Sequence, residues 1–248
     1  MKLCISALSV VLVLLFVSAA PQLAAKNVKK PQAKVVRAVD LLSFDHYLKT
    51  CPQAEGIIQQ ITGDWIQKDF TLAASIIRLH FHDCAVRGHE NVTALIEFFQ
   101  ARGLNMLDLV TLSGAHTIGR SSCSSFKYRL SNFNGTRKPD PSLNSMYLNN
   151  FLKKKCQNDL DLIYLDAITP KTFDTQFYSN LHKKLGLLST DQLLKSDVRT
   201  GPFVAALASQ PSLFESQFAV SMVKLGNVQV LTRPNEGEIR VNCNFVNA

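Results

Sequence analysis

The chain has 248 residues and carries 27 Lys and Arg against 19 Asp and Glu, a formal net charge of +8 at pH 7. The positive charge is spread along the sequence without a nucleic-acid-binding motif or interleaved aromatic residues, which argues against a nucleic-acid partner and leaves ordinary solubility or contact with acidic polysaccharide. No segment beyond the first two dozen residues approaches the length of a transmembrane helix.

The N-terminal segment has the pattern of a secretory signal peptide. Met1-Lys2 gives a short positive start, an almost wholly apolar run continues to Val17, and small residues follow. That run is too short to span a bilayer comfortably. We therefore expect a signal peptide at residues 1–25, a basic arm at 26–40, and one domain at 41–248 in a protein secreted to the extracellular space or cell wall.

The cysteine count is odd once the signal peptide and its Cys4 are removed. Five thiols in an oxidising compartment cannot all pair within one chain, so at least one is free, bonded between molecules or without its partner. The five are Cys51, Cys84, Cys123, Cys156 and Cys243.

Two consecutive helices are expected after the arm. Apolar residues at a spacing of three and four, among them Ile57, Ile61 and Trp65, predict an amphipathic helix over residues 54–70. A second helix should run over residues 71–84. Its apolar residues cover much of its circumference, which indicates a buried helix.

The second of these helices concentrates reactive side chains. Residues four apart share one face of a helix, so Arg78 and His82 should point the same way while His80 points elsewhere. A buried guanidinium is tolerated only where something uses its charge. Arg78 and His82 are therefore candidates for an acid/base pair with a fixed positive charge beside it.

The remaining segments are predominantly helical, so the fold class is mainly α. Asp108 is expected to cap a helix that reaches about Ile118, and the small residues before His116 should let something bulky and flat lie close to the backbone. The only extended segment is expected at 237–242. Glycosylation sequons begin at Asn91 and Asn134. Further helical or apolar segments are expected at 91–102, 142–158, 173–185, 192–196, 201–210 and 211–225.

Several motifs together resemble the class III plant secretory haem peroxidases. The run Arg78-Leu79-His80-Phe81-His82-Asp83-Cys84 is similar to the distal helix signature of that family, and residues 108–119, which contain Ser113-Gly114-Ala115-His116, are similar to its proximal haem-ligand signature. Shorter matches follow, and the resemblance covers residues 42–246. It implies the haem peroxidase fold, in which haem lies between a distal and a proximal helical half.

The resemblance also implies an internal deletion. The family continues its distal motif with several dozen residues that contain two helices and three cysteines, whereas here Gly88 is followed at once by His89. The partners of Cys51, Cys84 and Cys243 would lie in that block, so only the bridge between Cys123 and Cys156 should remain. Each lost bridge is worth roughly 3–4 kcal/mol in the chain-entropy model, against a total stability of about 5–15 kcal/mol.

The roles implied for the site residues follow the family. His116 would ligate the iron of haem b, and Asp191 would be the carboxylate on its other ring nitrogen. On the distal side His82 would act as general base and then general acid towards hydrogen peroxide, Arg78 would stabilise the charge that develops, and Phe81 would contact the haem.

Calcium is the second cofactor that the resemblance implies. A proximal site of hard oxygen ligands would be complete, with Thr117, Asp166, Thr169, Thr172 and Asp174. A distal site would keep only Asp83, Val86 and Gly88. A zinc site at His80, His82 and Cys84 is the less favoured alternative, because a spacing of two scatters ligands around a helix.

The leading hypothesis is a secreted, monomeric haem peroxidase that reduces hydrogen peroxide and oxidises phenolic donors in one-electron steps, with a role in the response to oxidative stress and acidic cell-wall polysaccharide as a further partner. No nucleic-acid or membrane partner is expected. The alternative is a shortened, non-enzymatic isoform that folds poorly or binds wall polysaccharide without haem. The join at Gly88-His89 separates the two hypotheses.

Overall fold

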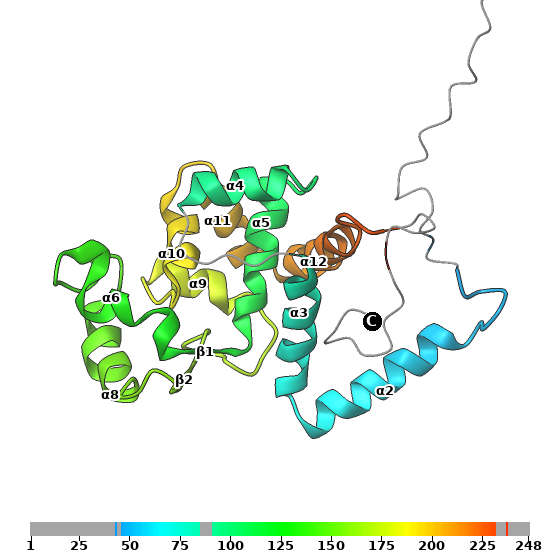
Figure 1. Ribbon diagram of the computed structural model, residues 1–248, viewed down its shortest axis with the longest axis horizontal. Coiled ribbons are helices and arrows are strands. Elements are labelled where there is room, and N and C mark those ends of the chain that lie inside the picture. Colours follow the sequence, from blue (N-terminus) through cyan, green and yellow to red (C-terminus); the bar gives the residue numbers. More distant parts are fainter. Residues whose placement is uncertain (1–42, 44–45, 85–90, 232–236, 238–248) are drawn as a thin grey trace, which may run out of the picture. The chain divides into compact units, whose positions relative to one another are not determined.

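A computed structural model describes residues 43, 46–84, 91–231 and 237, and from Phe81 to Cys84 it describes the backbone alone. The described residues all belong to one compact unit, Arg37–Ala248. Helices dominate this part of the chain (Figure 1), which confirms the mainly α fold class. None of the helices in the described part is long and apolar enough to cross a membrane.

The longer helices are α2 (Ala54–Lys68), α3 (Thr71–Cys84), α4 (Val92–Gln100), α5 (Met106–Ser113), α9 (Gln176–His182), α10 (Ser189–Ser196), α11 (Gly201–Ser209) and α12 (Pro211–Gly226). The short ones are α6 (Lys127–Ser131), α7 (Ser145–Tyr147), α8 (Lys153–Lys155), the 3₁₀ turns η2 (Gly114–Thr117), η3 (Cys123–Ser125) and η4 (Phe133–Gly135), and the π-helical turn η5 (Leu148–Leu152). The helix expected over 142–158 is thus the run α7, η5 and α8.

The main hydrophobic core surrounds α5. Val110 of α5, Tyr178 of α9, Leu207 of α11 and Phe214 of α12 have no measurable exposure and belong to one cluster. Figure 1 shows α5 lying among α4, α9, α11 and α12. Close packing on all sides fixes α5 and therefore the chain that leaves its C-terminal end.

A second core cluster is organised by the predicted disulfide. Cys123 and Cys156 are bonded, with Cα atoms 5.7 Å apart, and pack with Phe126, Leu152 and Leu187. The bridge that the sequence predicts to survive is therefore present.

The start of α5 differs from the expected one. Asn105 is the N-cap residue: its side chain accepts a hydrogen bond from the backbone N–H of Asp108, and the Asp108 carboxylate accepts one from the N–H of Asn105, both at 2.9 Å. Asp108 is thus the third helical residue in a capping box and not the cap itself. The prediction missed Asn105 because both residue types cap helices well.

The end of this helix also differs. The α-helix stops at Ser113 and tightens into η2, after which residues 120–122 form strand β1 (Arg120–Ser122). This strand pairs antiparallel with β2 (Leu162–Tyr164), Ser121 lying opposite Ile163. The expectation of a single extended segment is therefore wrong. A strand of three residues is too short to show the alternation of apolar and polar residues by which a strand is recognised in a sequence. Residues 238–242 of the expected segment lie outside the described residues.

The two helices that precede the gap in the described chain are far more exposed than the sequence predicts. No residue of α2 is buried, and the apolar face expected to pack inward leaves Ile58 62% and Trp65 56% exposed. In α3, Leu79 is 66% exposed and Arg78 is exposed as well. The prediction of a buried helix at 71–84 is wrong, because amphipathic periodicity shows which face is apolar and not whether a partner covers it.

Candidate active site

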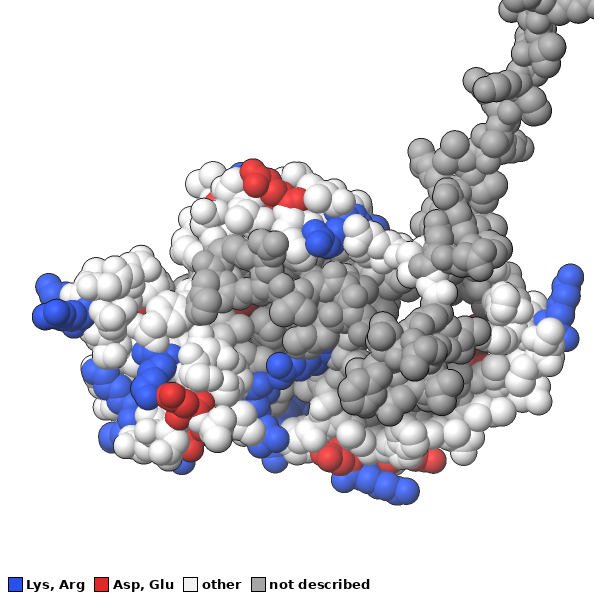
Figure 2. Space-filling view, in the orientation of Figure 1, with Lys and Arg blue, Asp and Glu red and all other residues white. Residues whose placement is uncertain are grey.

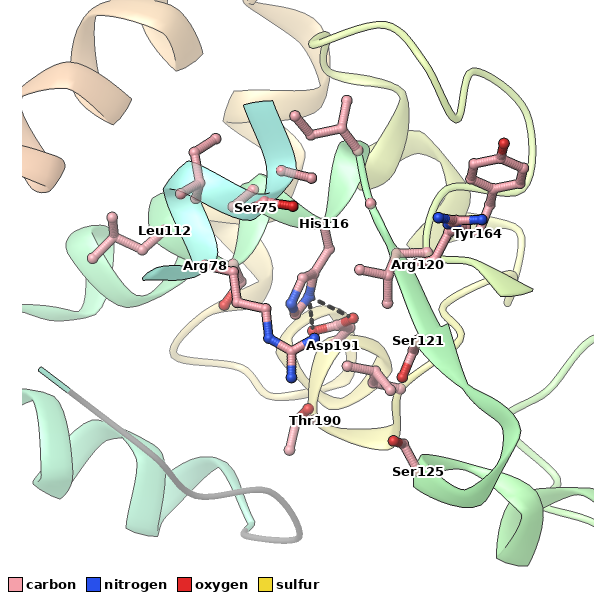
Figure 3. A pocket seen from close by; sticks show the side chains of 18 of the residues that line it. Ser75, Arg78, Leu112, His116, Arg120, Ser121, Ser125, Tyr164, Thr190 and Asp191 are labelled. Carbon is pink, nitrogen blue, oxygen red and sulfur yellow. Dashed lines mark hydrogen bonds and ion pairs between the residues drawn. The ribbon is translucent and has the colours of Figure 1, made fainter. Parts of the chain in front are cut away.

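A cavity of about 770 Å³ lies between α3 and the segment that carries His116. Its lining comes from α3, from the segment that runs from α5 through η2 into β1, and from the starts of α10 and the end of α12. Figure 3 shows His116, Arg78 and Asp191 around the same space. The volume is in the range of sites for cofactors and other small molecules.

His116 and Asp191 form the central polar pair of this cavity. Nδ1 of His116 lies 3.1 and 3.0 Å from the two carboxylate oxygens of Asp191. The His116 side chain is 34% exposed, whereas that of Asp191 is 5% exposed. Burial lowers the pKa of His116, but the charge and hydrogen bond of Asp191 outweigh this and raise its pKa above the usual value. Because Asp191 engages Nδ1, Nε2 is the nitrogen left for another ligand.

The two residues come together for separate local reasons. His116 lies in η2, directly after α5, and Asp191 lies in the first turn of α10, 75 residues later. A carboxylate in the first turn of a helix is stabilised there by the helix dipole. The sequence prediction that these two residues meet is consistent with the distance between them.

Gly114 serves a different purpose from the one expected. A Cβ atom at Gly114 would collide with the Tyr178 hydroxyl and with the Phe214 ring, 2.6 Å away. The Tyr178 hydroxyl instead donates to the backbone carbonyls of Val110 and Thr111. Gly114 therefore makes room for core aromatics, whereas Ser113 and Ala115, the other small residues before His116, line the cavity as expected.

On the α3 side, Arg78 and His80 face different ways, as their spacing predicts. Arg78 lines the cavity, and Figure 3 shows its side chain extending towards Asp191. The His80 ring packs on α12, with Nε2 3.3 Å from the carbonyl oxygen of Met222 and Cε1 3.0 Å from the Cβ position of Gly226. This arrangement gives no support to zinc binding by His80. The side chains of Phe81, His82 and Cys84 lie outside the described residues.

Sequence reasoning missed Arg120. It lies four residues after His116, at the start of β1, and lines the same cavity (Figure 3). Arg78 and Arg120 thus give the cavity two cations from different elements. A basic residue immediately after Gly119 was the available signal; its place in the cavity depends on the short strand that the sequence did not reveal.

A cluster of oxygen atoms surrounds the hydroxyl of Thr117, the residue that follows His116 in the sequence. The Thr117 hydroxyl donates to Asp174 Oδ1 at 3.1 Å, and so does the Thr169 hydroxyl. The carbonyl oxygen of Thr172 lies 3.4 Å from the Thr117 hydroxyl. The structure therefore brings together the residues predicted for proximal calcium.

Asp166 is the least satisfied member of this cluster. Its Oδ1 accepts from the N–H groups of Ile168 and Thr169 and from Asn180 Nδ2, at 2.7–2.9 Å. Its Oδ2 is buried with no hydrogen-bond partner. Burial, and less strongly the charge of Asp174, raise the pKa of Asp166 in spite of the hydrogen bonds to Oδ1. An unpartnered buried carboxylate oxygen on a residue of the expected ligand set fits a hard cation such as Ca²⁺.

The other predicted site residues stay predictions. The ligands expected for distal calcium, Asp83, Val86 and Gly88, lie outside the described residues, as does Cys243. Cys51 is a free cysteine. Asn91 and Asn134 are both exposed, as glycosylation requires, and Asn91 caps α4 by accepting from Ala94 N–H at 2.9 Å.

The cavity has the features of a haem-binding peroxidase site: a carboxylate-bound histidine on one side and an arginine-bearing helix on the other. Comparison with known proteins agrees. A family model described as "Peroxidase" matches residues 88–210. The chain is 33% identical over 299 residues to Peroxidase 7 of Arabidopsis thaliana, covering 84% of this chain and 85% of that protein. It is 31% identical to Peroxidase 15 of Ipomoea batatas, covering 82% and 91%.

This chain therefore belongs to the plant class III haem peroxidases and is an oxidoreductase of the peroxidase class. The alignment with Peroxidase 7 is longer than the 248 residues of this chain, so many positions of the relative have no counterpart here. That difference supports the expected deletion, while its location after Gly88 stays a prediction.

Proposed function

We propose that the cavity binds haem b with His116 as the protein ligand to iron. The observation that carries the proposal is the hydrogen-bonded pair of His116 and the buried Asp191, which holds the ring by Nδ1 and leaves Nε2 for the metal. Hydrogen bonding to a carboxylate makes the imidazole a stronger electron donor. Arg120, which lines the same cavity, would supply a cation for the carboxylates that haem b carries.

Haem iron, when bound, supplies the redox chemistry by which peroxide is reduced and donors are oxidised. The protein residues handle protons and charge. His82 would take a proton from hydrogen peroxide and return it to the departing oxygen, and Arg78 would stabilise the negative charge that develops there. The backbone of α3 continues as helix through residue 84, which places His82 one turn beyond Arg78.

Phenols are the proposed electron donors and the oxidative-stress response the proposed setting, in a monomeric protein secreted to the cell wall. An open cavity supports small aromatic donors: Tyr164 and Leu162 lie in its lining, and Leu162 is 53% exposed. Acidic wall polysaccharide remains a proposed partner on the basis of the net charge of +8.

Calcium is the second proposed cofactor. Asp166 and Asp174 would provide carboxylate oxygens, Thr117 and Thr169 hydroxyl oxygens, and Thr172 its carbonyl. The ion would give the buried Oδ2 of Asp166 the partner that it lacks. Because Thr117 directly follows His116, an ion there would also fix the turn that carries the iron ligand.

The proposed catalytic roles are tested by comparing two histidines of one helix. His82→Ala should retain haem but lower the rate of peroxide-dependent phenol oxidation by about 10²–10⁴-fold, the usual worth of a general acid–base group. His80→Gln is the matched control, since His80 packs against α12, and it should keep wild-type rates. Equal rates for His82→Ala and wild type would refute the assignment.

The non-enzymatic alternative is favoured by one observation, the exposure of apolar residues of α2 and of α3, the helix that resembles the family's distal helix. Haem binding by the wild-type chain decides between the enzymatic and the non-enzymatic hypothesis. A folded wild-type chain that binds no haem when supplied with haemin and calcium would support the alternative.

A further inference from the structure

The start of α10 is the element on which the proposed iron site depends most. Asp191 is the third residue of this helix, so its carboxylate moves with the first turn. The residue before the helix, Leu188, has no side chain able to cap it, and no side-chain cap is present. A helix end without a cap frays readily unless other contacts hold it.

Contacts from α6 hold this helix start. Arg129, which is fully buried, donates from Nη1 to the carbonyls of Gly186 and Leu187 at 2.8 and 2.6 Å, and its charge is balanced by Asp140 at 2.7 Å. One residue earlier, the hydroxyl of Tyr128 shares a hydrogen bond of 2.6 Å with the hydroxyl of Ser189, the first residue of α10. Arg129 thus holds the loop before the helix, whereas Tyr128 reaches the helix itself.

Tyr128 also faces the proposed site. Tyr128, Ser189 and Asp191 all line the cavity that contains His116. The Tyr128 ring stacks on Phe133, with centroids 6.1 Å apart, so ring packing directs the hydroxyl independently of Ser189. The connected groups therefore run from Tyr128 through Ser189 and the first turn of α10 to Asp191 and the His116 ring.

We propose that Tyr128 is a positioning residue for the iron site: through Ser189 it fixes the first turn of α10 and thereby the hydrogen bond that His116 Nδ1–H donates to Asp191. The proposal rests on the proposed role of His116 as iron ligand. A weaker hydrogen bond from His116 Nδ1–H to Asp191 leaves the imidazole a poorer electron donor, which weakens the bond from iron to nitrogen and favours ferrous over ferric iron. Tyr128 itself touches neither iron nor substrate in this scheme.

The test uses the haem-loaded full chain and two hydroxyl deletions, Tyr128→Phe and Ser189→Ala. Both should shift the iron–histidine stretching band of the ferrous protein to lower frequency and the ferric/ferrous midpoint potential to more positive values. The direction should match that of Asp191→Asn and the size should be smaller. The double variant should shift no further than either single variant, because the two hydroxyls act through one bond.

A matched control is Tyr164→Phe, which removes another tyrosine hydroxyl from the cavity lining, one that points away from Asp191 in Figure 3. It should leave the iron–histidine band in place. A second readout needs no haem: amide hydrogen exchange in residues 189–192 of the haem-free chain should be faster in Tyr128→Phe than in Tyr164→Phe.

The outcomes separate this inference from the proposed function. If Asp191→Asn shifts the band while Tyr128→Phe changes neither the band nor amide exchange, the positioning role is wrong and the iron site stands. If His116→Ala keeps the wild-type band, the iron ligand is wrong, and amide exchange alone then decides whether Tyr128 holds α10. Additive shifts in the double variant would also overturn the inference.

Discussion

Replacing Asp166 by Asn should have opposite effects on stability with and without calcium. Asn keeps an oxygen for the three hydrogen bonds that Asp166 Oδ1 accepts, and it exchanges the unpartnered Oδ2 for a neutral amide. Without calcium, the substitution removes the negative charge of a buried carboxyl group whose pKa is raised by burial and by the charge of Asp174. We therefore expect Asp166→Asn to be neutral or stabilising in chelator at pH 7.

With calcium the sign should reverse. An ion at 100 times its dissociation constant stabilises the native state by about 2.7 kcal/mol, and this contribution is lost when a carboxylate ligand is removed. For a domain of this size each kcal/mol corresponds to about 2–4 °C, so calcium should raise the unfolding temperature of the wild type by roughly 5–11 °C. The variant should show little or none of this rise.

The assay is thermal unfolding followed by circular dichroism in calcium and in chelator, for wild type, Asp166→Asn and Asp159→Asn. Asp159 is an exposed carboxylate paired with Lys127 and serves as the control for a general charge effect. Equal unfolding temperatures of the wild type with and without calcium would refute the proposed site. A calcium response in Asp166→Asn equal to that of the wild type would place the ion elsewhere.

Three further predictions concern pH, packing and thiols. Burial raises the pKa of Asp108, but hydrogen bonds from Asn105, Ser221 and Lys224 outweigh it and lower the pKa below the usual value. The stabilisation by this carboxylate should therefore be present above pH 4 and be lost as the pH falls through the lowered pKa. Asp108→Asn should lower the free energy of unfolding by about 1–3 kcal/mol at pH 7 in urea, and the difference from wild type should shrink as the pH falls. Ile58→Ala should lower the free energy of unfolding by less than about 0.5 kcal/mol and Leu152→Ala by about 2–5 kcal/mol, since the two side chains are 62% and 0% exposed. Equal losses of stability would show that another surface buries the apolar face of α2. Titration of the unfolded chain without its signal peptide should find three free thiols, and a lower count would indicate a new bridge.

Patterns that depend on neighbours along the chain were predictable from sequence. The spacing of Arg78 and His80 predicted their opposite directions in α3, and the proximal motif predicted the meeting of His116 with Asp191. In the first case helical geometry alone decides the direction. In the second the family resemblance supplied a long-range contact that no local rule contains.

Features that depend on which elements pack against each other were not predictable from the sequence. The apolar spacing in α2 predicts a face that packs against the core, yet Trp65 on that face is 56% exposed. Gly114 was expected to face a flat ligand, but the space beside it is filled by Tyr178, 64 residues away. No local sequence pattern connects Tyr128 with Ser189, so only the folded chain reveals the hydrogen bond between them.

The most direct test of the iron site is a haemin titration of the wild type and His116→Ala, followed by the Soret band, with circular dichroism to show that both are folded. We expect a band that saturates at one haemin per chain in the wild type and is absent in His116→Ala. A band of equal intensity in both proteins, or none in a folded wild type, would contradict the assignment of His116 as the ligand that makes this chain a haem protein.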